Sequence, residues 1–450
     1  MRALALVSAM MGIAAHAQTF TTLVNFSGPN GAIPTYESLV QGIDGNFYGT
    51  TSLGTSQNLG TVFVMNPQGQ LRTLHNFDGT DGANPQAGLM AAPNGMLYGT
   101  TSYGGANGDY GTIFQITPNG TLTTLHSFSG TDGANPYAGL VQAFDGMLYG
   151  TTSRGGASGN GTIFQITPSG ALTTLHSFSG TDGANAFAGL VQAANGMLYG
   201  TTTEGGAYNA GTIYAIGLSG AFTPLYSFDI TDGLNPYGAL VEGADGNFYG
   251  TTNRGGASVY GTVFRITATG TLTLLDSFDS TDGAQPSGGL VKGTHGDFYG
   301  TTADGGADFY GYGTVFQIAP TGTLTTLHSF DRAGGAAPLG GLVQGTDGNF
   351  YGTTNGGGAG EYGTVFRLSM GLGPLVKTLP AFGKVGAAVK ILGTDLTGAT
   401  SVTFNGTPAA FTILFPTAIQ TTVPSGASTG TVQVVTPSGT IASNMLFQVL

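Results

Sequence analysis

The chain has 450 residues, of which 81 are glycine, 40% are hydrophobic and only 8% are charged. This apolar content is enough to bury a core, and the formal net charge of −12, with 11 lysines and arginines, argues against nucleic acid or anionic lipid as a partner. The absence of cysteine excludes disulfides, cysteine-based zinc sites and thiol catalysis.

The N-terminus has the pattern of a secretory signal peptide. Arg2 precedes an apolar run over residues 3–15, and Ala-His-Ala at residues 15–17 gives a small-x-small cleavage sequence. We predict a signal peptide over residues 1–17, with cleavage before Gln18 and a secreted or cell-surface location. The alternative is an ordinary buried first strand. No other segment has the roughly 18 apolar residues that a transmembrane helix needs, so none is expected.

A unit of about 50 residues then repeats seven times, up to residue 370. The sequence Tyr-Gly-Thr-Thr marks the copies at Tyr48, Tyr98, Tyr149, Tyr199, Tyr249, Tyr299 and Tyr351. Each copy contains four short runs rich in β-branched and aromatic residues, bounded by Gly, Asn, Asp and Pro, which predict strands. In the third copy they are residues 139–143, 147–152, 162–167 and 172–178. Seven four-stranded units predict an all-β, seven-bladed β-propeller over residues 18–370, with an open repeat stack as the alternative.

The two ends of the repeat region predict how the ring closes. Residues 19–26 resemble the fourth run of the later copies, whereas the last copy stops after its third run, residues 363–369. The N-terminal strand can therefore supply the fourth strand of the seventh blade, which leaves few exposed strand edges. A linear solenoid would not need this arrangement.

The connections within a copy predict two different faces. The first two runs are joined by Asp-Gly or Asn-Gly, as at Asp145-Gly146, for which we predict a type I′ turn. In an antiparallel blade the tight turns share one face of the ring, which we name the turn face. The longer loops between the second and third strands share the other face with the connections between blades. We name this the loop face and expect any binding surface there.

Residues 371–374, Gly-Leu-Gly-Pro, form a predicted linker, and residues 375–450 have a different pattern. Short β-rich runs there predict the strands of a small sandwich. They are residues 389–393, 402–406, 423–426 and 431–435.

The unit Leu-Tyr-Gly-Thr-Thr-Ser-Arg-Gly-Gly-Ala-Ser-Gly-Asn-Gly-Thr-Ile-Phe at residues 148–164 resembles the bacterial tandem repeat called GloVer. This resemblance extends over the seven copies and implies an exported bacterial protein, without a particular activity. The C-terminal pattern, with Val402-x-Phe404 and Val423-Pro424, resembles the IPT/TIG immunoglobulin-like domain. Such domains in bacteria are commonly surface or spacer modules, sometimes beside carbohydrate-active domains.

Side chains of the loop face are the candidates for ligand binding. Aromatic rings stack on sugars and anchor protein partners, although some of them must pack between blades instead. The candidate ligand-binding residues are Tyr103, Tyr110, Arg154, Tyr208, Arg254, Tyr260, Tyr310 and Tyr362. Other aromatic residues predicted on this face include Tyr137, Phe187 and Tyr237. Single acids there, at Glu204, Asp304, Asp308 and Glu361, are where paired glycosidase carboxylates would have to lie.

Oxygen-bearing side chains in the connections between blades are weak candidates for calcium ligands. They are Asp78, Asp81, Asn84, Asp229, Asp232 and Asn235. We favour the simpler interpretation that these side chains cap turns by accepting hydrogen bonds from nearby backbone N–H groups. Four histidines at one repeated position, His75, His126, His176 and His328, lie on separate blades and are interpreted as structural. No other cofactor is expected.

These patterns favour a secreted or cell-surface, non-enzymatic binding or scaffold protein whose ligand is an extracellular glycan or another protein. Two alternatives stay open. One is a carbohydrate-active enzyme or lectin that uses the loop face, and the other is a structural, self-assembling surface protein. The sequence contains no motif that assigns catalytic residues, and it does not determine the oligomeric state.

Overall fold

The computed structural model describes residues 18–34, 36, 38–55, 57–307 and 311–450. The predicted signal peptide, residues 1–17, therefore lies outside the described residues. The described ranges contain strands and turns but no α-helix, and so no helix that could span a membrane is found in them. The all-β prediction is confirmed.

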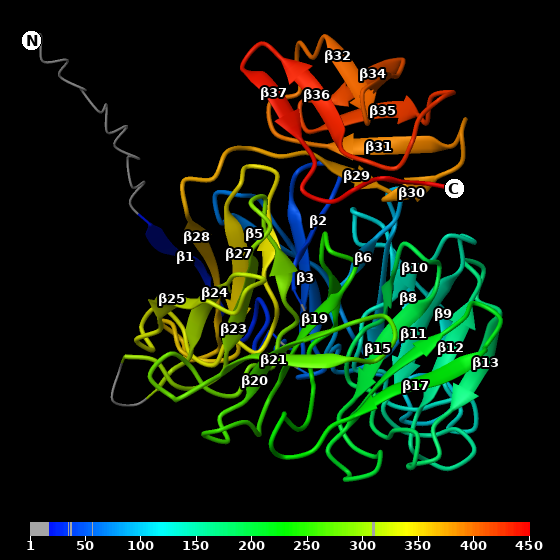
Figure 1. The fold of residues 1–450 in the computed structure, drawn as a ribbon, viewed down its shortest axis with the longest axis vertical. Helices are drawn as coiled ribbons and strands as arrows, with labels where there is room; N and C mark the ends of the chain where they lie inside the picture. Colours follow the sequence, from blue (N-terminus) through cyan, green and yellow to red (C-terminus); the bar gives the residue numbers. More distant parts are fainter. Residues whose placement is uncertain (1–17, 35, 37, 56, 308–310) are drawn as a thin grey trace, which may run out of the picture.

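Seven four-stranded antiparallel sheets, the blades, surround a central channel (Figure 1). From the innermost strand outward, the first four blades consist of β2 (Val40–Gln41), β3 (Phe47–Thr51), β4 (Thr61–Met65) and β5 (Leu71–Asn76); β6 (Met90–Ala91), β7 (Leu97–Thr101), β8 (Thr112–Ile116) and β9 (Leu122–Ser127); β10 (Val141–Gln142), β11 (Leu148–Thr152), β12 (Thr162–Ile166) and β13 (Leu172–Ser177); and β14 (Val191–Gln192), β15 (Leu198–Thr202), β16 (Thr212–Ile216) and β17 (Phe222–Ser227). The last three blades consist of β18 (Val241–Glu242), β19 (Phe248–Thr252), β20 (Thr262–Ile266) and β21 (Leu272–Ser277); β22 (Val291–Lys292), β23 (Phe298–Thr302), β24 (Thr314–Ile318) and β25 (Leu324–Ser329); and β26 (Val343–Gln344), β27 (Phe350–Thr354), β28 (Thr364–Ser369) and β1 (Thr19–Asn25).

The N-terminal strand closes the ring as predicted. β1 pairs antiparallel with β28, from Thr19 opposite Ser369 to Asn25 opposite Thr364, and is the outermost strand of blade 7 (Figure 1). A buried cluster that includes Phe26, Phe47 and Tyr351 joins blade 7 to blade 1, and equivalent clusters fill the other six interfaces between neighbouring blades. The blades therefore form a closed seven-bladed propeller.

The tyrosine of each Tyr-Gly-Thr-Thr packs between blades, as Tyr249 illustrates. Its ring stacks on Phe298 of the next blade with centroids 4.2 Å apart. Its hydroxyl donates a 2.9 Å hydrogen bond to the carboxylate of Asp245, in the hairpin turn of its own blade. One side chain thus fixes both the turn and the interface, which explains why all seven copies contain it.

The other residues of the motif have equally specific roles. A Cβ atom on Gly250 would lie 2.7 Å from the ring of Phe264 and 2.8 Å from Leu240, so only glycine fits between them. The buried hydroxyls of Thr252 and Thr262 lie 2.7 Å apart and tie β19 to β20. The repeat sequence is therefore a packing requirement.

Two local predictions were wrong. In the Asp145-Gly146 turn only Gly146 has positive φ, and its N–H bonds the carbonyl of Ala143, which is a type I turn followed by a glycine bulge. Asp145 keeps negative φ because its carboxylate accepts the N–H of Met147, at 3.0 Å. The innermost strand is also shorter than predicted. Only Val141–Gln142 pairs with β11, because the preceding residues line the channel instead.

The C-terminal strands form an immunoglobulin-like sandwich. One sheet has the order β29-β31-β35-β34, the other has β33-β32-β36-β37, and β30 pairs parallel with β38. The strands are β29 (Lys377–Leu379), β30 (Phe382–Gly383), β31 (Ala388–Leu392), β32 (Ser401–Phe404), β33 (Thr407–Pro408), β34 (Phe411–Phe415), β35 (Ala418–Thr422), β36 (Val432–Thr436), β37 (Gly439–Ala442) and β38 (Gln448–Val449). The predicted run at residues 423–426 is a turn, because Pro424 offers no N–H to a ladder.

The sandwich covers the turn face of the propeller (Figure 1). The hydroxyl of Thr417 donates to the carbonyl of Ile43 at 3.0 Å, and the ring of Phe382 lies 4.9 Å from that of Phe144. The loop face lies at the opposite end of the channel.

Candidate binding site at the loop-side mouth of the channel

Two positions of each repeat meet at the loop-side mouth of the channel. The first position lies in the connection between blades, three residues before the leucine that directly precedes each innermost strand. It holds Tyr36, Gln86, Tyr137, Phe187, Tyr237, Ser287 and Leu339. The second lies just past the second strand and bridges to the same connection, as in the pairing of Arg154 with Ala134. It holds Leu53, Tyr103, Arg154, Glu204, Arg254, Asp304 and Gly356.

Four rings at the first position form what we name the aromatic cluster: Tyr36, Tyr137, Phe187 and Tyr237. Ring centroids lie 4.6 Å apart between Tyr137 and Phe187, and 5.4 Å apart between Phe187 and Tyr237. Tyr36 of blade 1 stacks on Tyr237 of blade 5 at 6.3 Å, so the cluster reaches across the channel. All four side chains are half-buried, which leaves part of each ring accessible.

Five side chains at the second position surround this cluster, and we name them the rim residues: Tyr103, Arg154, Glu204, Arg254 and Asp304. The Tyr103 hydroxyl lies 3.4 Å from that of Tyr137. The four charged rim residues are exposed and alternate in sign over blades 3 to 6. The mouth therefore combines accessible rings with both donors and acceptors of hydrogen bonds.

The tyrosine hydroxyls of the cluster are kept protonated. Burial raises the pKa of Tyr36, and it is also the main reason why the pKa of Tyr237 is raised. Burial, and then the hydrogen bond with Tyr103, raise the pKa of Tyr137. These hydroxyls can therefore donate hydrogen bonds to a ligand at any physiological pH.

A hollow of about 260 Å³ lies beside the cluster, inside the channel. Tyr36, Phe187 and Tyr237 form one wall, and the innermost strands of blades 5 to 7 form the other. Glycines such as Gly289 and Gly341 let the innermost segments of this wall lie close together, since a Cβ atom on Gly341 would be 2.9 Å from the carbonyl oxygen of Gly289. The cluster thus stands at the entrance to a space of small-ligand size.

Comparison with known families identifies the repeat. The family model of the Gloeobacter/Verrucomicrobia repeat matches residues 9–214, 94–311 and 192–410, and so covers most of the chain. The chain belongs to this family. The IPT/TIG domain model matches residues 376–449, where the structure has the sandwich. Both resemblances seen in the sequence are confirmed. No curated protein matches the chain at a significant level.

Solved structures share the fold of this Gloeobacter/Verrucomicrobia repeat protein. The extracellular domain of a putative hybrid two-component system from B. thetaiotaomicron matches 94% of this chain at 13% identity, with a TM-score of 0.52. The match covers 53% of that domain, so the chain spans about half its length. A putative 6-phosphogluconolactonase from Bacteroides uniformis matches 68% of this chain and 88% of its own, at 16% identity and a TM-score of 0.48. Identities this low bear on the fold alone.

The repeat places the predicted ligand-binding residues in two groups. Tyr103, Arg154 and Arg254 belong to the rim. The others lie farther out in the loops of the loop face, where their side chains are exposed: Tyr110, Tyr208, Tyr260 and Tyr362. Tyr310 lies outside the described residues.

The backbone of three outer tyrosines is bonded to the connections between blades. The carbonyls of Tyr110, Tyr260 and Tyr362 accept N–H groups from these connections at 2.8 to 2.9 Å, a bond that other residue types make at the same position of other blades and that leaves the side chains free to act. The ring of Tyr362 also covers Gly28, where an added Cβ atom would lie 3.7 Å from it. Sequence analysis missed Tyr36 and the clustering of the four rings. Comparing the copies at the position three residues before the inner leucine would have shown both.

The proposed calcium ligands act as turn caps in the repeat. One carboxylate oxygen of Asp78 accepts the N–H groups of Thr80 at 2.8 Å and Asp81 at 3.2 Å. These bonds, and first the one from the Thr80 hydroxyl, lower the pKa of Asp78. The carboxylate of Asp81 accepts the N–H of Asp78 and lies 2.6 Å from the imidazole of His75. The same turn bonds recur at Asp229 and Asp232.

The two asparagines of this candidate set connect blades. The amide of Asn84 donates to the carbonyl of Ser52 at 2.9 Å, and that of Asn235 donates to the carbonyl of Thr203 at 2.8 Å. Among the described residues, no group of three or more His, Asp or Glu side chains is arranged to hold a metal ion. The observed contacts are those expected of turn and blade connections.

Proposed function

We propose that the protein is exported and acts as a non-enzymatic binding protein that takes a glycan at the loop-side mouth of its propeller. The aromatic cluster carries this proposal. Its four rings are not part of the common repeat pattern, yet blades 1, 3, 4 and 5 bring them together opposite the sandwich. The signal peptide expected at residues 1–17 supports an extracellular location.

The chemistry of the mouth suits a saccharide. Half-buried rings offer apolar faces on which the C–H face of a sugar stacks. Arg154, Arg254 and Glu204 offer donors and acceptors for hydroxyl groups, and the hollow beside the rings admits the end of a chain. A stable protein interface usually buries about 800 Å² on each partner, whereas these rings converge on a narrow opening. We therefore rank a protein partner second.

The acids of the rim support binding rather than hydrolysis. Glu204 accepts a 2.7 Å hydrogen bond from the amide of Asn185. Glu204 and Asp304 lie on blades 4 and 6, with Arg254 on the blade between them, whereas a glycosidase pairs two carboxylates across the scissile bond.

The proposal is tested by applying the purified chain to a glycan array, in calcium and in EDTA. We expect selective binding to a small set of glycans, and equal signals in both buffers because the connection carboxylates already cap turns. Tyr237→Ala removes a ring of the cluster and should abolish the signal. Tyr208→Ala is the matched control, since Tyr208 is 69% exposed on the outer loop face.

The glycan proposal would be overturned if the unaltered chain bound no glycan of the array selectively. Equal loss of glycan binding in Tyr237→Ala and Tyr208→Ala would also overturn it. Loss of binding in EDTA would instead support calcium binding by the carboxylates in the connections between blades. Release of shortened sugars from a bound glycan would replace binding by hydrolysis as the function.

A further inference from the structure

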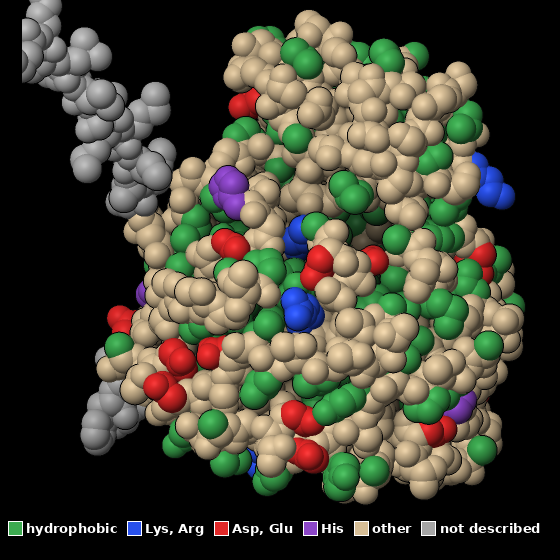
Figure 2. All heavy atoms as spheres, viewed as in Figure 1, with side chains coloured by type: hydrophobic (Ala, Val, Ile, Leu, Met, Phe, Trp, Pro, Cys, Tyr) green, Lys and Arg blue, Asp and Glu red, His purple; other side chains and the backbone are tan. Residues whose placement is uncertain are grey.

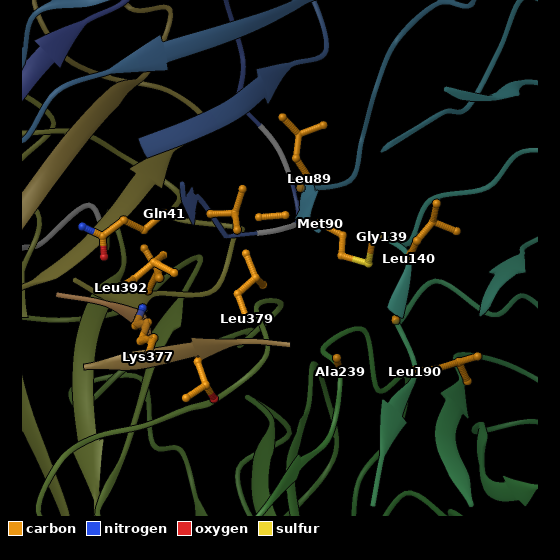
Figure 3. A pocket seen from close by; sticks show the side chains of 16 residues that line it. Gln41, Leu89, Met90, Gly139, Leu140, Leu190, Ala239, Lys377, Leu379 and Leu392 are labelled. Carbon is orange, nitrogen blue, oxygen red and sulfur yellow. The ribbon is translucent and has the colours of Figure 1, made fainter. Parts of the chain in front are cut away.

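The sandwich closes the turn-side end of the channel over a second chamber, which shares Ala239 and Val343 with the hollow at the loop-side mouth. This chamber has a volume of about 350 Å³. Its walls come from the innermost strands, where Gly88, Gly139 and Gly189 leave room, and its roof comes from β29 and β31 of the sandwich (Figure 3). Leucine and methionine side chains, including Met90 and Leu140, make the lining mostly apolar.

Lys377 carries the one charged side chain among the sixteen described residues that line the chamber. It lies on β29 two positions before Leu379, and Figure 3 shows its amine directed toward Leu392. No hydrogen bond or ion pair to this amine is found within the described part of the chain. The amide of Gln41, the other strongly polar group nearby, is already bonded to Gly45 and Thr346.

An ammonium group in such surroundings is costly unless an anion compensates it. Burial lowers the pKa of Lys377 to about 8, and the carboxylate of Asp347 acts in the opposite direction. That carboxylate is already bonded to the hydroxyl of Tyr351 and to Asn349, at 2.7 Å each. Asp347 is therefore a weak partner, and the chamber is best matched by a ligand that brings its own single negative charge.

A groove of about 540 Å³ adjoins the chamber and opens between the sandwich and the propeller. Met90, Ala91, Leu140, Leu190 and Leu379 line both spaces. Figure 2 shows this surface hollowed, with hydrophobic side chains beside the hollow. The groove continues past Phe144, Phe382 and Leu446, so it offers an apolar path outward from Lys377.

Two further charged residues line the groove but not the chamber. Glu242 accepts the N–H of Ala194 at 3.2 Å, and Lys292 lies on the next blade. Burial raises the pKa of Glu242, and Lys292 lowers it. The opposite charges of Glu242 and Lys292 compensate one another in the groove. The chamber, with Lys377, is therefore the cationic end of the combined space.

We propose that this chamber and groove bind a medium-chain carboxylate, with its carboxylate on the ammonium of Lys377 and its alkyl chain along the groove beneath the sandwich. One cation in an apolar space selects a monoanion over phosphate or a polyanion. The apolar path selects an alkyl chain over a sugar. This site is independent of the loop-side mouth and would not be altered by failure of the glycan proposal.

The test is calorimetric titration of the full chain with decanoate, below its micelle-forming concentration, and with decanol as the neutral probe. At pH 7 we expect decanoate to bind at least ten times more tightly than decanol. Lys377→Met should remove that preference while it leaves decanol binding unchanged, and it should raise the melting temperature because a charge no longer lies in a mostly apolar space. Lys384→Met, at an exposed lysine of the sandwich, is the matched control and should behave as the unaltered chain.

A pH series and a variant that blocks the site distinguish specific binding from nonspecific hydrophobic adsorption. Decanoate stays ionised above pH 7, so its affinity should fall as the pH rises from 7 to 10 and Lys377 loses its proton. Ala91→Phe, in the wall shared by chamber and groove, should reduce the binding of both probes. Equal affinities for decanoate and decanol, an unchanged preference in Lys377→Met, or no binding of either probe would overturn the proposal.

Discussion

The blade interiors and the loop-side mouth are built from the same seven copies, yet they use them in opposite ways. Inside the blades the motif Tyr-Gly-Thr-Thr is identical in every copy, and paired threonine hydroxyls join the second and third strands throughout. At the mouth, the position of Arg154 holds Tyr, Glu, Asp or Gly in other blades. Inside each blade the surroundings are the same in every copy, so the same side chain is required. Residues that face the channel axis contact residues of other blades, and their types can differ from copy to copy.

This difference shows where to look for function in a repeat protein. A position that is constant among the copies reports packing, and a position that varies where the copies converge reports a site. The same comparison separates Tyr149, which is fully buried, from Tyr137, which is half-buried at the mouth. The following substitutions test the distinction through the free energy of unfolding, and they are ordered by the size of the expected effect.

The largest effect is expected for Phe164→Ala. Phe164 is 0% exposed and packs edge-to-face on Phe128, with centroids 5.4 Å apart. Truncation of such a ring leaves a cavity and typically costs about 3–5 kcal/mol. Urea unfolding followed by circular dichroism measures the loss. A loss below about 1 kcal/mol would mean that the blade collapses around the cavity and that this position, aromatic in all seven copies, does not report packing.

A smaller effect is expected for Thr152→Val, which keeps the shape but removes a buried hydroxyl. This hydroxyl lies 2.9 Å from that of Thr162 and donates to the carbonyl of Arg154. Leaving those partners unsatisfied should cost about 1–3 kcal/mol. The same change at Thr173, an exposed residue of the outermost strand, is the control and should cost less than about 0.5 kcal/mol. Equal losses at both sites would contradict a role for the threonine pair.

Constant positions explain why the fold could be predicted from the sequence. Seven copies at nearly equal spacing, four strands per copy and the incomplete seventh copy predict the propeller and its closure by β1. The turn type at Asp145 could not be predicted, because Asp-Gly suits both a type I′ turn and a type I turn with a bulge, and the hydrogen bond to Met147 decides between them. The placement of the sandwich depends on contacts such as that of Thr417 with Ile43, which no local pattern indicates.

The candidate site was predicted only in part, for a related reason. Its face follows from strand direction, and Arg154 and Arg254 were among the candidate ligand-binding residues predicted on that face. Tyr36 and Tyr237 are distant in the sequence and meet only because the ring closes between them. The half-buried Lys377 was missed because its surroundings come from two different parts of the chain.

Asp276→His should stabilise the protein slightly, because Asp276 occupies a position at which several other copies have a histidine. In three other blades that position holds a histidine that lies 2.6 to 3.0 Å from an aspartate. Asp276 instead lies near Asp282, and one of its buried carboxylate oxygens has no partner in the described residues. An added histidine–aspartate pair should contribute about 0.5–1 kcal/mol at pH 7.

The two neighbouring acids, Asp276 and Asp282, should also make the stability of the protein depend on pH. Burial raises the pKa of both Asp276 and Asp282, so the folded state holds their protons more tightly than the unfolded chain does. Stability from this pair is therefore present at acidic pH and lost as the pH rises through the raised values. Melting temperatures from pH 4 to 7 measure it, and the unaltered chain should lose more stability over this range than Asp276→Asn. Parallel curves would show that Asp276 does not hold its proton more tightly in the folded state than in the unfolded chain.

The smallest effect is expected at the mouth itself, for Arg254→Gln. The Arg254 side chain is exposed at the rim, so its replacement should change the free energy of unfolding by less than about 0.5 kcal/mol. The same substitution at Arg265, in the same blade, shortens a half-buried side chain of β20 that packs on its sheet, and should cost about 1 kcal/mol. If Arg254→Gln costs as much as Arg265→Gln, the rim is part of the packed framework. If it is neutral for folding but weakens glycan binding, Arg254 serves the ligand rather than the fold.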